Sequence, residues 1–343
     1  MEYRINSYIT AGSIISSLGF GTEENFSRIR EYRSGIARVE DTALFDTPFM
    51  AARIDNIRLK ALAQELDGYT RMEQLFILSL SDTIRQSGID PADPGCGLIL
   101  STTKGNIDGL AASRNEHSIT LAIDTQLRSQ SAPDYGRNRH PIGESATASS
   151  GLFGMAMRVA GYFGCVNEPV VISNACISGV SALIVASRLI EAGKYKHILV
   201  AGGDLLTRFV VTGFQSFKSV SPEICKPYDK ARDGLSLGEA CGSVLVASDR
   251  GLVGEEQPVS IAGGSITNDA NHISGPSRTG DGLYYAISQA MDEAGLQQEA
   301  ISFVNAHGTA TLYNDEMESK AIHLAGLETV PVHSLKSYFG HTL

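Results

Sequence analysis

The sequence predicts an α/β fold built from layers of sheet and helix, and two observations lead to this prediction. Short apolar segments typical of strands alternate with segments of helical period along the chain, as in layered α/β domains. The chain also has 35 glycines among 343 residues, which suits many tight turns because glycine adopts positive φ without steric cost. At about 150 residues per domain, this length corresponds to two domains or one two-lobed unit.

The first elements follow from local patterns. Residues 3–15 predict a strand that leads into a Gly/Ser turn. Thr22 is predicted to cap a helix over residues 22–30, whose first turn carries two glutamates at the positive end of the helix dipole. Residues 71–87 are amphipathic and predict a second helix, and Gly88 is a natural position for that helix to end.

The central elements place a cysteine at a turn. Residues 97–100 predict a short buried strand, and the polar stretch 111–145 predicts a long loop or a partly helical excursion. A strand over 170–173 is then followed by a turn at Cys176 and by a helix over 178–192 that is almost free of charge. Because a helix that is apolar on nearly every face must be buried on every face, we expect this turn at the centre of the molecule.

A weak internal repeat accompanies these elements. The helix, glycine, linker and strand of residues 78–101 match those of residues 286–306, and the unit around the cysteine turn has a counterpart over 301–332. Chance similarity between α/β units explains such a match, and so does an internal duplication. In the second case the boundary falls near residues 249–258, where Gly, Glu and Pro cluster.

Composition limits the partners. Hydrophobic residues make up 43% of the chain and charged residues 19%, which excludes a disordered or collagen-like protein. The chain carries 28 Lys and Arg against 38 Asp and Glu, a net charge of −10, and no basic cluster. We therefore exclude nucleic acid and disfavour an anionic membrane surface as the main partner. An acidic protein could still dock on a local basic patch.

The chain shows no signal peptide and no convincing membrane span. Glu2 and the lack of an apolar stretch after a basic start argue against a secretory signal. Residues 170–187 carry no charge, but polar side chains divide them into a strand, a turn and a buried helix. Five scattered cysteines without a CxxC motif favour a reduced, cytoplasmic protein.

Cys176 is the strongest candidate for chemistry. A thiol at a strand-to-helix turn lies beside the positive end of the helix, which lowers its pKa and favours the nucleophilic thiolate. A backbone N–H of the same turn could serve as one donor of an oxyanion hole. A buried structural cysteine is the alternative, and it is the interpretation preferred for the others, namely Cys96, Cys165, Cys225 and Cys241.

Two histidines are candidates beside it. His307 and His341 follow predicted strands and lie next to glycines, at the strand ends where α/β folds place ligands. A zinc site formed by these two and Cys176 is an alternative, but their spacing fits no ligand motif and no fourth ligand is evident, so we predict no metal. Nucleotide-binding motifs and a GxSxG elbow are absent from the sequence.

Collinear motifs then identify a family. With these motifs the chain resembles the β-ketoacyl-acyl-carrier-protein synthases of the elongating, Cys-His-His type, over residues 3–343. The motifs are Asn174-Ala175-Cys176-Ile177-Ser178-Gly179, Ala201-Gly202-Gly203-Asp204, Lys226-Pro227-Tyr228-Asp229, Gly238-Glu239-Ala240-Cys241-Gly242, Asn268-Asp269-Ala270-Asn271-His272, Asn305-Ala306-His307-Gly308-Thr309 and Lys336 to His341.

The resemblance implies a thiolase-like αβαβα layered sandwich of two pseudo-repeated halves. Residues 1–250 would form the N-terminal half with the nucleophile, and residues 251–343 the C-terminal half with both histidines. The family continues for several dozen residues beyond the position of His341, so we expect a C-terminally truncated sequence with an incomplete second half. That further stretch also supplies a glutamate partner for Lys336 in the family.

The resemblance also implies an acyltransferase reaction. Malonyl on acyl carrier protein undergoes decarboxylative Claisen condensation with an acyl chain held as a thioester on Cys176, in fatty-acid or polyketide and polyene lipid biosynthesis. His307 and His341 would polarise the thioester carbonyl and stabilise the enolate, and Lys336 would support them electrostatically. The chemistry needs no bound cofactor, because the substrates are carried on 4′-phosphopantetheine.

The implied partners are acyl carrier protein and its malonyl and acyl thioesters, in a homodimer or a ketosynthase heterodimer. Thr309 and Thr311 would hydrogen-bond the phosphopantetheine arm. Because acyl carrier protein is acidic, the enzyme needs a basic docking rim, for which Arg71 matches a family position. Weaker candidates for this rim are Arg58, Lys60 and Lys218.

Two alternatives remain. Residues 103–145 diverge from the family pattern and Ile177 is bulkier than the usual residue, which favours a dedicated synthase of a secondary pathway. The other alternative is a non-catalytic partner subunit that sets chain length within a heterodimer. Retention of the Cys-His-His residues and Lys336 argues against that subunit, and the expected truncation argues for it.

Overall fold

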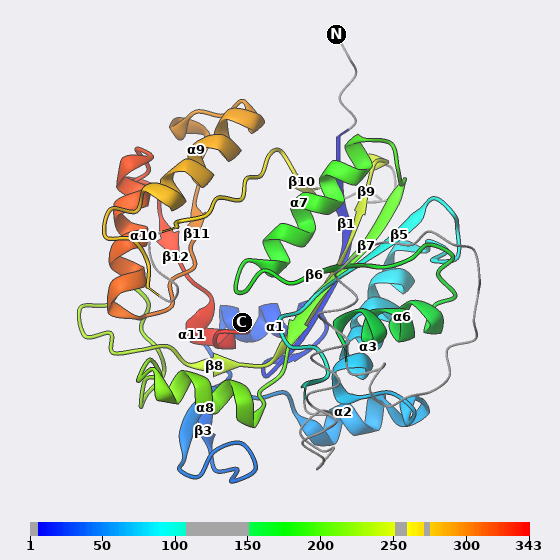
Figure 1. Cartoon of the computed structure of the whole chain (residues 1–343), viewed down its shortest axis with the longest axis horizontal. Coiled ribbons are helices and arrows are strands. Elements are labelled where there is room, and N and C mark those ends of the chain that lie inside the picture. Colours follow the sequence, from blue (N-terminus) through cyan, green and yellow to red (C-terminus); the bar gives the residue numbers. More distant parts are fainter. Residues whose placement is uncertain (1–5, 108–150, 251–258, 271–274) are drawn as a thin grey trace.

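The computed structural model describes residues 6–107, 151–250, 259–270 and 275–343 (Figure 1). The predicted excursion over 111–145 lies outside the described residues, as do His272 and most of the expected boundary at 249–258.

A mixed sheet of seven strands forms the centre of the larger lobe. Its strands follow the order β10-β1-β9-β7-β5-β6, and β2 pairs with β1. The three strands β7, β5 and β6 are parallel, whereas β9 runs antiparallel to both of its neighbours. The strands are β1 (Tyr8–Ser16), β2 (Gly19–Phe20), β5 (Cys96–Ser101), β6 (Val170–Ile172), β7 (His197–Asp204), β9 (Ala240–Ala247) and β10 (Val259–Ser260).

Alternating side chains of the central strands pack against helices on both faces of this sheet. In β5, Leu98 and Leu100 join the core formed with helices α3 (Arg71–Ser87) and α6 (Leu152–Tyr162). Ile99 points the other way and packs with the core of α7 (Ser178–Glu191). This period of two is why a strand between two helical layers is apolar at every position.

Local signals explain the boundaries of some helices. The predicted helix α3 is confirmed: Thr70 and Glu73 form a reciprocal capping box at its start, and Gly88 ends it in the left-handed conformation. Helix α1 (Thr22–Arg30) is also confirmed, but its cap is not. Gly21 is the residue before the helix, and the Thr22 hydroxyl donates 3.0 Å to the Gly12 carbonyl instead.

A smaller three-stranded sheet lies beside the main one. Its order is β3-β4-β8, and its apolar core includes residues of helix α8. The elements of this region are β3 (Ile36–Val39), β4 (Phe49–Ala52), α8 (Arg208–Ser216) and β8 (Leu237–Gly238). Helix α2 (Asn56–Leu62) and the 3₁₀ helix η1 (Gln64–Leu66) follow β4 and pack on the main core.

The second lobe has the order of helix, glycine, linker and strand that the sequence predicts. Like α3, helix α9 ends at a left-handed glycine, Gly295, and a linker then leads to a strand. The parallel strands β11 and β12 carry the turn that contains His307. The elements are α9 (Asp281–Ala294), η3 (Gln298–Ala300), β11 (Val304–Asn305), α10 (Leu312–Leu324), β12 (Val332–His333) and α11 (Lys336–Phe339).

The order of layers is that of the predicted sandwich. Figure 1 shows α3 and α6 on one side of the seven-stranded sheet, α7 on its other side, and then β11 and β12 with α9 and α10 outside them. None of the described helices is long and apolar enough to cross a membrane.

Complete burial of the helix after Cys176 is not observed. Ala182, Ala186 and Ile190 of α7 are fully buried against the main sheet, but Val180 is 59% exposed. Cys176 itself is exposed rather than central. Within the described residues, the second lobe contacts the later turns of α7, where Gly264 lies against Ile184 and Arg188 pairs with Glu293 of α9, and it leaves Val180 in the first turn exposed.

Candidate active site

A strained turn places Cys176 at the start of α7. The Ser178 hydroxyl accepts a hydrogen bond from the Asn174 N–H at 2.7 Å and donates to the Ala175 carbonyl at 2.6 Å. Ala175 has φ 45°, in the left-handed region that non-glycine residues rarely adopt. These bonds close the turn between β6 and α7, so the cysteine lies at the amino end of the helix.

A buried carboxylate holds the turn of His307. The backbone N–H groups of His307 and Gly308 donate to the two oxygens of Glu318, at 2.7 and 2.8 Å. Glu318 lies on α10 and is 5% exposed. The left-handed Gly308 also passes close to Ser334, where a Cβ would be only 2.5 Å from that side chain, so only glycine fits.

Glu318 has a third partner that sequence reasoning missed. The Tyr228 hydroxyl donates to Glu318 Oε2 at 2.6 Å, and the Tyr228 N–H donates to Asp315 Oδ2 at 2.8 Å. Tyr228 is itself in the left-handed region, with φ 62°. A helix with two acids three residues apart, directly after the His307 turn, was the available signal for this cluster, because such residues share one helix face.

Removal of the Tyr228 hydroxyl is expected to destabilise the fold. Tyr228→Phe leaves one bond of a buried carboxylate unmade, which costs about 2 kcal/mol for a bond to a charged group. Urea unfolding measures this loss. The control is Tyr313→Phe, since Tyr313 is 73% exposed, and equal stabilities of the two variants would contradict the prediction.

A β-bridge presents the second histidine. His341 lies after α11, and its backbone pairs with that of Leu237: the His341 N–H donates 2.7 Å to the Ser236 carbonyl, and the Gly238 N–H donates 2.9 Å to the His341 carbonyl. The side chain is 4% exposed. Its Nδ1 accepts the N–H of Leu343 at 3.2 Å.

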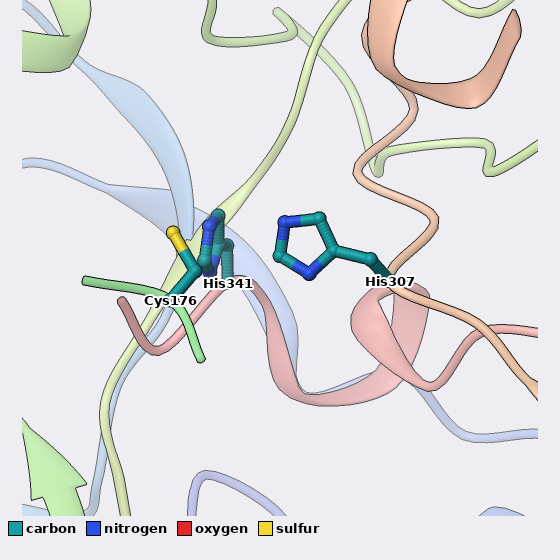
Figure 2. Close-up of side chains that lie close together, drawn as sticks. All are labelled: Cys176, His307 and His341. Atoms are coloured by element: carbon teal, nitrogen blue, oxygen red, sulfur yellow. The ribbon is translucent and has the colours of Figure 1, made fainter. Parts of the chain in front are cut away.

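The three predicted residues converge. Figure 2 shows the ring of His307 pointing toward His341, whose ring lies beside the Cys176 sulfur. One side-chain atom of each residue lies within 4.8 Å of those of the other two. The two imidazole rings meet edge to face, with centroids 5.3 Å apart. A cysteine and two histidines that lie more than a hundred residues further along the chain therefore form a single cluster.

The hydrogen-bond partners of the two Nδ1 atoms define the proton positions on both histidines. Its Nζ lies 3.3 Å from His307 Nδ1, and an ammonium can only donate, so Nδ1 is the acceptor. In neutral His307 the proton then resides on Nε2. The same reasoning applies to His341, because its Nδ1 accepts the Leu343 N–H. Each neutral ring therefore has one N–H left to donate, at Nε2.

Burial keeps both imidazoles neutral. Burial first and the nearby Lys336 charge second lower the pKa of His307 to about 4. The same two causes, with His307 and Lys104 adding to them, hold the pKa of His341 well below its usual value. Burial also lowers the pKa of Lys336 itself, while the Glu318 carboxylate acts to raise it. At neutral pH the pair is thus available as two hydrogen-bond donors.

The thiol differs from its expected state. We predicted a lowered pKa for Cys176, but the protein around its sulfur raises that pKa, although the residue as a whole is exposed. Lys336 and, more weakly, Lys104 oppose the shift, and Asp204 adds to it. Desolvation therefore outweighs the two cations and the backbone hydrogen bond at Cys176.

The depressed pKa of His307 makes stability pH-dependent. The unfolded histidine binds a proton at higher pH than the folded one, so this group stabilises the fold above pH 6.5 and less as pH falls toward 4. The loss reaches about 3 kcal/mol. The unfolding free energies of the wild type and of His307→Gln are measured at pH 7 and at pH 4.5. Only the wild type has this histidine to protonate, so the difference between the two proteins should be smaller at pH 4.5. A pH-independent difference would contradict this.

A metal ion is a second potential occupant of the cluster. One thiol and two imidazoles are ligands that zinc accepts, and among the described residues the group comprises these three. The ammonium of Lys336, 3.3 Å from His307, repels a divalent cation. The site without metal therefore stays our prediction.

The two threonines expected to bind the pantetheine arm lie near His307. Thr309 is buried and Thr311 is half-buried, and their hydroxyls are 2.9 Å apart, within hydrogen-bond distance. Thr311 precedes α10, and its side chain makes no capping bond to that helix. Each hydroxyl therefore keeps capacity for a further partner.

Half of the expected docking rim is paired within the protein. Arg71 makes a two-bond ion pair with the fully buried Glu239, at 2.8 and 2.7 Å. Arg58 pairs with Glu24 at 2.8 Å. Exposed lysines remain, namely Lys60 and Lys218.

Comparisons with known proteins support the same family. The family described as "Beta-ketoacyl synthase, N-terminal domain" matches residues 8–250, and "Beta-ketoacyl synthase, C-terminal domain" matches residues 259–343. A 3-oxoacyl-[acyl-carrier-protein] synthase 2 of Vibrio cholerae is 27% identical over 98% of this chain and 81% of that relative. The enzyme of the same name from Synechocystis is 31% identical over 58% of this chain, a match that spans about half of that relative, 49%.

Solved structures of similar shape cover nearly the whole chain. The ishigamide ketosynthase/chain length factor matches with a TM-score of 0.79 and 25% identity, over 99% of this chain and 82% of that one. The ketosynthase ApeO in complex with its chain length factor ApeC, from Xenorhabdus doucetiae, matches with a TM-score of 0.76 and 25% identity, over 98% of this chain and 80% of that one. These matches confirm the predicted fold.

Proposed function

Because the chain belongs to the β-ketoacyl synthase family, we propose that it catalyses the decarboxylative condensation of a malonyl group with an acyl chain. The acyl chain is held as a thioester on Cys176, and acyl carrier protein delivers both substrates. The observation that carries this proposal is the convergence of a thiol with two neutral imidazoles within 4.8 Å.

The first half-reaction is a thioester exchange. Cys176 Sγ attacks the carbonyl carbon of the incoming acyl thioester, the new C–S bond forms, and the phosphopantetheine thiol leaves with the proton that the cysteine gives up. Lys336 and the amino end of α7 stabilise the thiolate and the developing oxyanion. The raised pKa of Cys176 keeps the free thiol protonated until substrate arrives.

The second half-reaction uses the histidines as donors. The Nε2–H groups of His307 and His341 donate to the carbonyl oxygen of the malonyl thioester. As CO2 leaves, the electron pair of the broken C–C bond forms an enolate on that oxygen. The enolate carbon then attacks the acyl carbonyl, and the Cys176 thiolate leaves. Neutral donors suit this step because they bind the developing charge without a preceding protonation.

The neighbouring residues suggest how the carrier is bound. Thr309 and Thr311 keep hydrogen-bonding capacity beside His307, which supports a role in holding the phosphopantetheine arm. Lys60 and Lys218 are exposed and suit contact with an acidic carrier protein better than the paired Arg71 and Arg58. Relatives named as pairs of a ketosynthase and a chain length factor support a heterodimer for this chain, and a homodimer is the alternative.

A condensation assay tests the proposal. The purified chain is incubated with acyl carrier protein loaded with an acyl group, and then with malonyl carrier. We expect an acyl adduct that maps to Cys176 by mass spectrometry, followed by CO2 release and a β-ketoacyl product. A folded, monodisperse protein that forms neither adduct nor product would contradict the proposal.

The second candidate function is a non-catalytic subunit that sets chain length. The names of similar structures include chain length factors, which favours it. The intact set of Cys176, His307, His341 and Lys336 favours the enzyme. Activity of this chain alone rejects the subunit, whereas activity that appears only with a partner ketosynthase, and survives Cys176→Ala, supports it.

A further inference from the structure

A charged loop lies next to the nucleophile. Three parallel strands end at the same edge of the main sheet: β6 leads to Cys176, β5 leads to Lys104, and β7 ends at Asp204. Ser101 at the end of β5 is in register with both neighbouring strands, and the next N–H, of Thr102, donates 3.2 Å to the carbonyl of Ile172. The loop after β5 and the cysteine turn are therefore side by side.

Asp204 fixes this loop. Its carboxylate is 3% exposed and accepts hydrogen bonds from the Thr102 hydroxyl at 2.9 Å and the Thr103 hydroxyl at 3.0 Å. It also accepts the N–H groups of Thr103 at 3.1 Å and Lys104 at 3.3 Å. A buried carboxylate with this many donors from one segment holds the backbone of that segment in a single position.

Lys104 is thereby held with hydrogen-bonding capacity to spare. Its half-buried ammonium donates to the Thr103 hydroxyl at 2.7 Å. In the part of the chain that the structure describes, no carboxylate lies within ion-pair distance of it. An ammonium has three donors, so two remain. The charge is close enough to affect both Cys176 and His341 electrostatically.

Unlike Lys336, Lys104 has no histidine to bind. A saturated acyl chain on Cys176 would displace water from this ammonium and offer no acceptor in return, which is unfavourable for a charged group. An acyl chain with an oxygen near its thioester would supply the missing acceptor, most strongly as a carboxylate.

We propose that Lys104 is a specificity-determining residue that selects acyl groups bearing a keto or carboxylate oxygen close to the thioester. This inference rests on the proposed function. Saturated acyl groups of the same length are disfavoured. Lys104 forms a hydrogen bond to that oxygen while the acyl group is transferred to Cys176, and Asp204 positions the loop that presents it.

Thioesters of equal length test the proposal. Butyryl-, acetoacetyl- and succinyl-pantetheine each transfer a four-carbon acyl group: the Cys176–acyl bond forms, the pantetheine C–S bond breaks, and pantetheine leaves as the thiol. The rate of adduct formation on Cys176 is followed by intact mass. We expect one or both oxygenated groups to react about 10-fold faster than butyryl, the gain of one good hydrogen bond.

Variants assign this preference to the ammonium. Lys104→Met keeps the length of the side chain and should bring the rate ratios close to one, whereas Lys104→Arg keeps them. Each rate is divided by the butyryl rate of the same protein, so a general change in thiol reactivity does not affect the comparison. Lys230→Met, which removes an exposed lysine elsewhere, should behave as the wild type. The acetoacetyl and succinyl arms show whether a neutral or a charged oxygen is recognised.

Two results overturn the inference while the proposed function stands. One is butyryl transfer as fast as both oxygenated groups in the wild type, and the other is a preference that Lys104→Met leaves unchanged. No adduct on Cys176 with any of the three thioesters, nor with acyl carrier protein, removes the proposed function and this inference together.

Discussion

Cys176→Ala is expected to abolish the acyl adduct and to lower condensation at least ~1,000-fold, the scale typical for removal of a catalytic nucleophile. The reason is that the cysteine is the acyl acceptor, and no second thiol can replace it. Cys96, Cys225 and Cys241 are buried, and Cys165 lies after α6, away from the cluster. Intact mass and product formation measure both effects.

The same variant should separate the two half-reactions. The histidines bind the malonyl carbonyl without help from the thiol, so CO2 release from malonyl carrier should persist in Cys176→Ala although no condensation product forms. Cys165→Ala is the matched control and should keep both activities. Condensation by Cys176→Ala above a hundredth of the wild-type rate would contradict the assignment of the nucleophile.

Much of the fold could be predicted because its signals are local. The helix over 71–87 has an apolar period and a terminal Gly88, and both are used in the structure. The strand predicted over 97–100 is apolar at every position because helices cover both faces of its sheet. Such features depend on neighbours a few residues away and on the side-chain period.

Contacts between distant segments could not be predicted in the same way. Glu318 approaches His307 and Tyr228 only after α10 packs beside the turn, and its role leaves no mark in the sequence beyond a pair of acids on a helix. In the sequence the family glutamate for Lys336 was expected beyond residue 343, whereas Glu318 already acts electrostatically on that lysine. The residues of a site can thus be predicted more readily than the residues that support it.

Properties that depend on burial were predicted least well. The pKa of Cys176 is raised although its turn has the expected form, because desolvation outweighs the nearby cations. The exposure of Val180 shows the converse error, in which an apolar pattern was equated with burial on all sides. Both quantities depend on how much of the second lobe covers α7, which no local pattern encodes.

Lys336→Met is expected to lower condensation about 100-fold, within the range observed when an electrostatic or proton-positioning group is removed. Two consequences follow from its place beside His307. The Nδ1 of His307 loses its donor, so the ring no longer prefers the tautomer with the proton on Nε2. The thiol of Cys176 loses the largest influence that lowers its pKa, so less thiolate is available at neutral pH.

The pH dependence of Lys336→Met distinguishes these effects from simple misfolding. Lys336 lowers the pKa of His307, so its removal raises that pKa from about 4 toward the ordinary value of 6.5. Activity needs neutral histidines, and the acid limb of the rate profile should therefore move to higher pH. The alkylation rate of Cys176 by iodoacetamide should shift in the same direction, since the thiol pKa also rises. Lys230→Met should leave both profiles in place, and an unshifted acid limb in a folded Lys336→Met protein would mean that this lysine does not control the histidine pair.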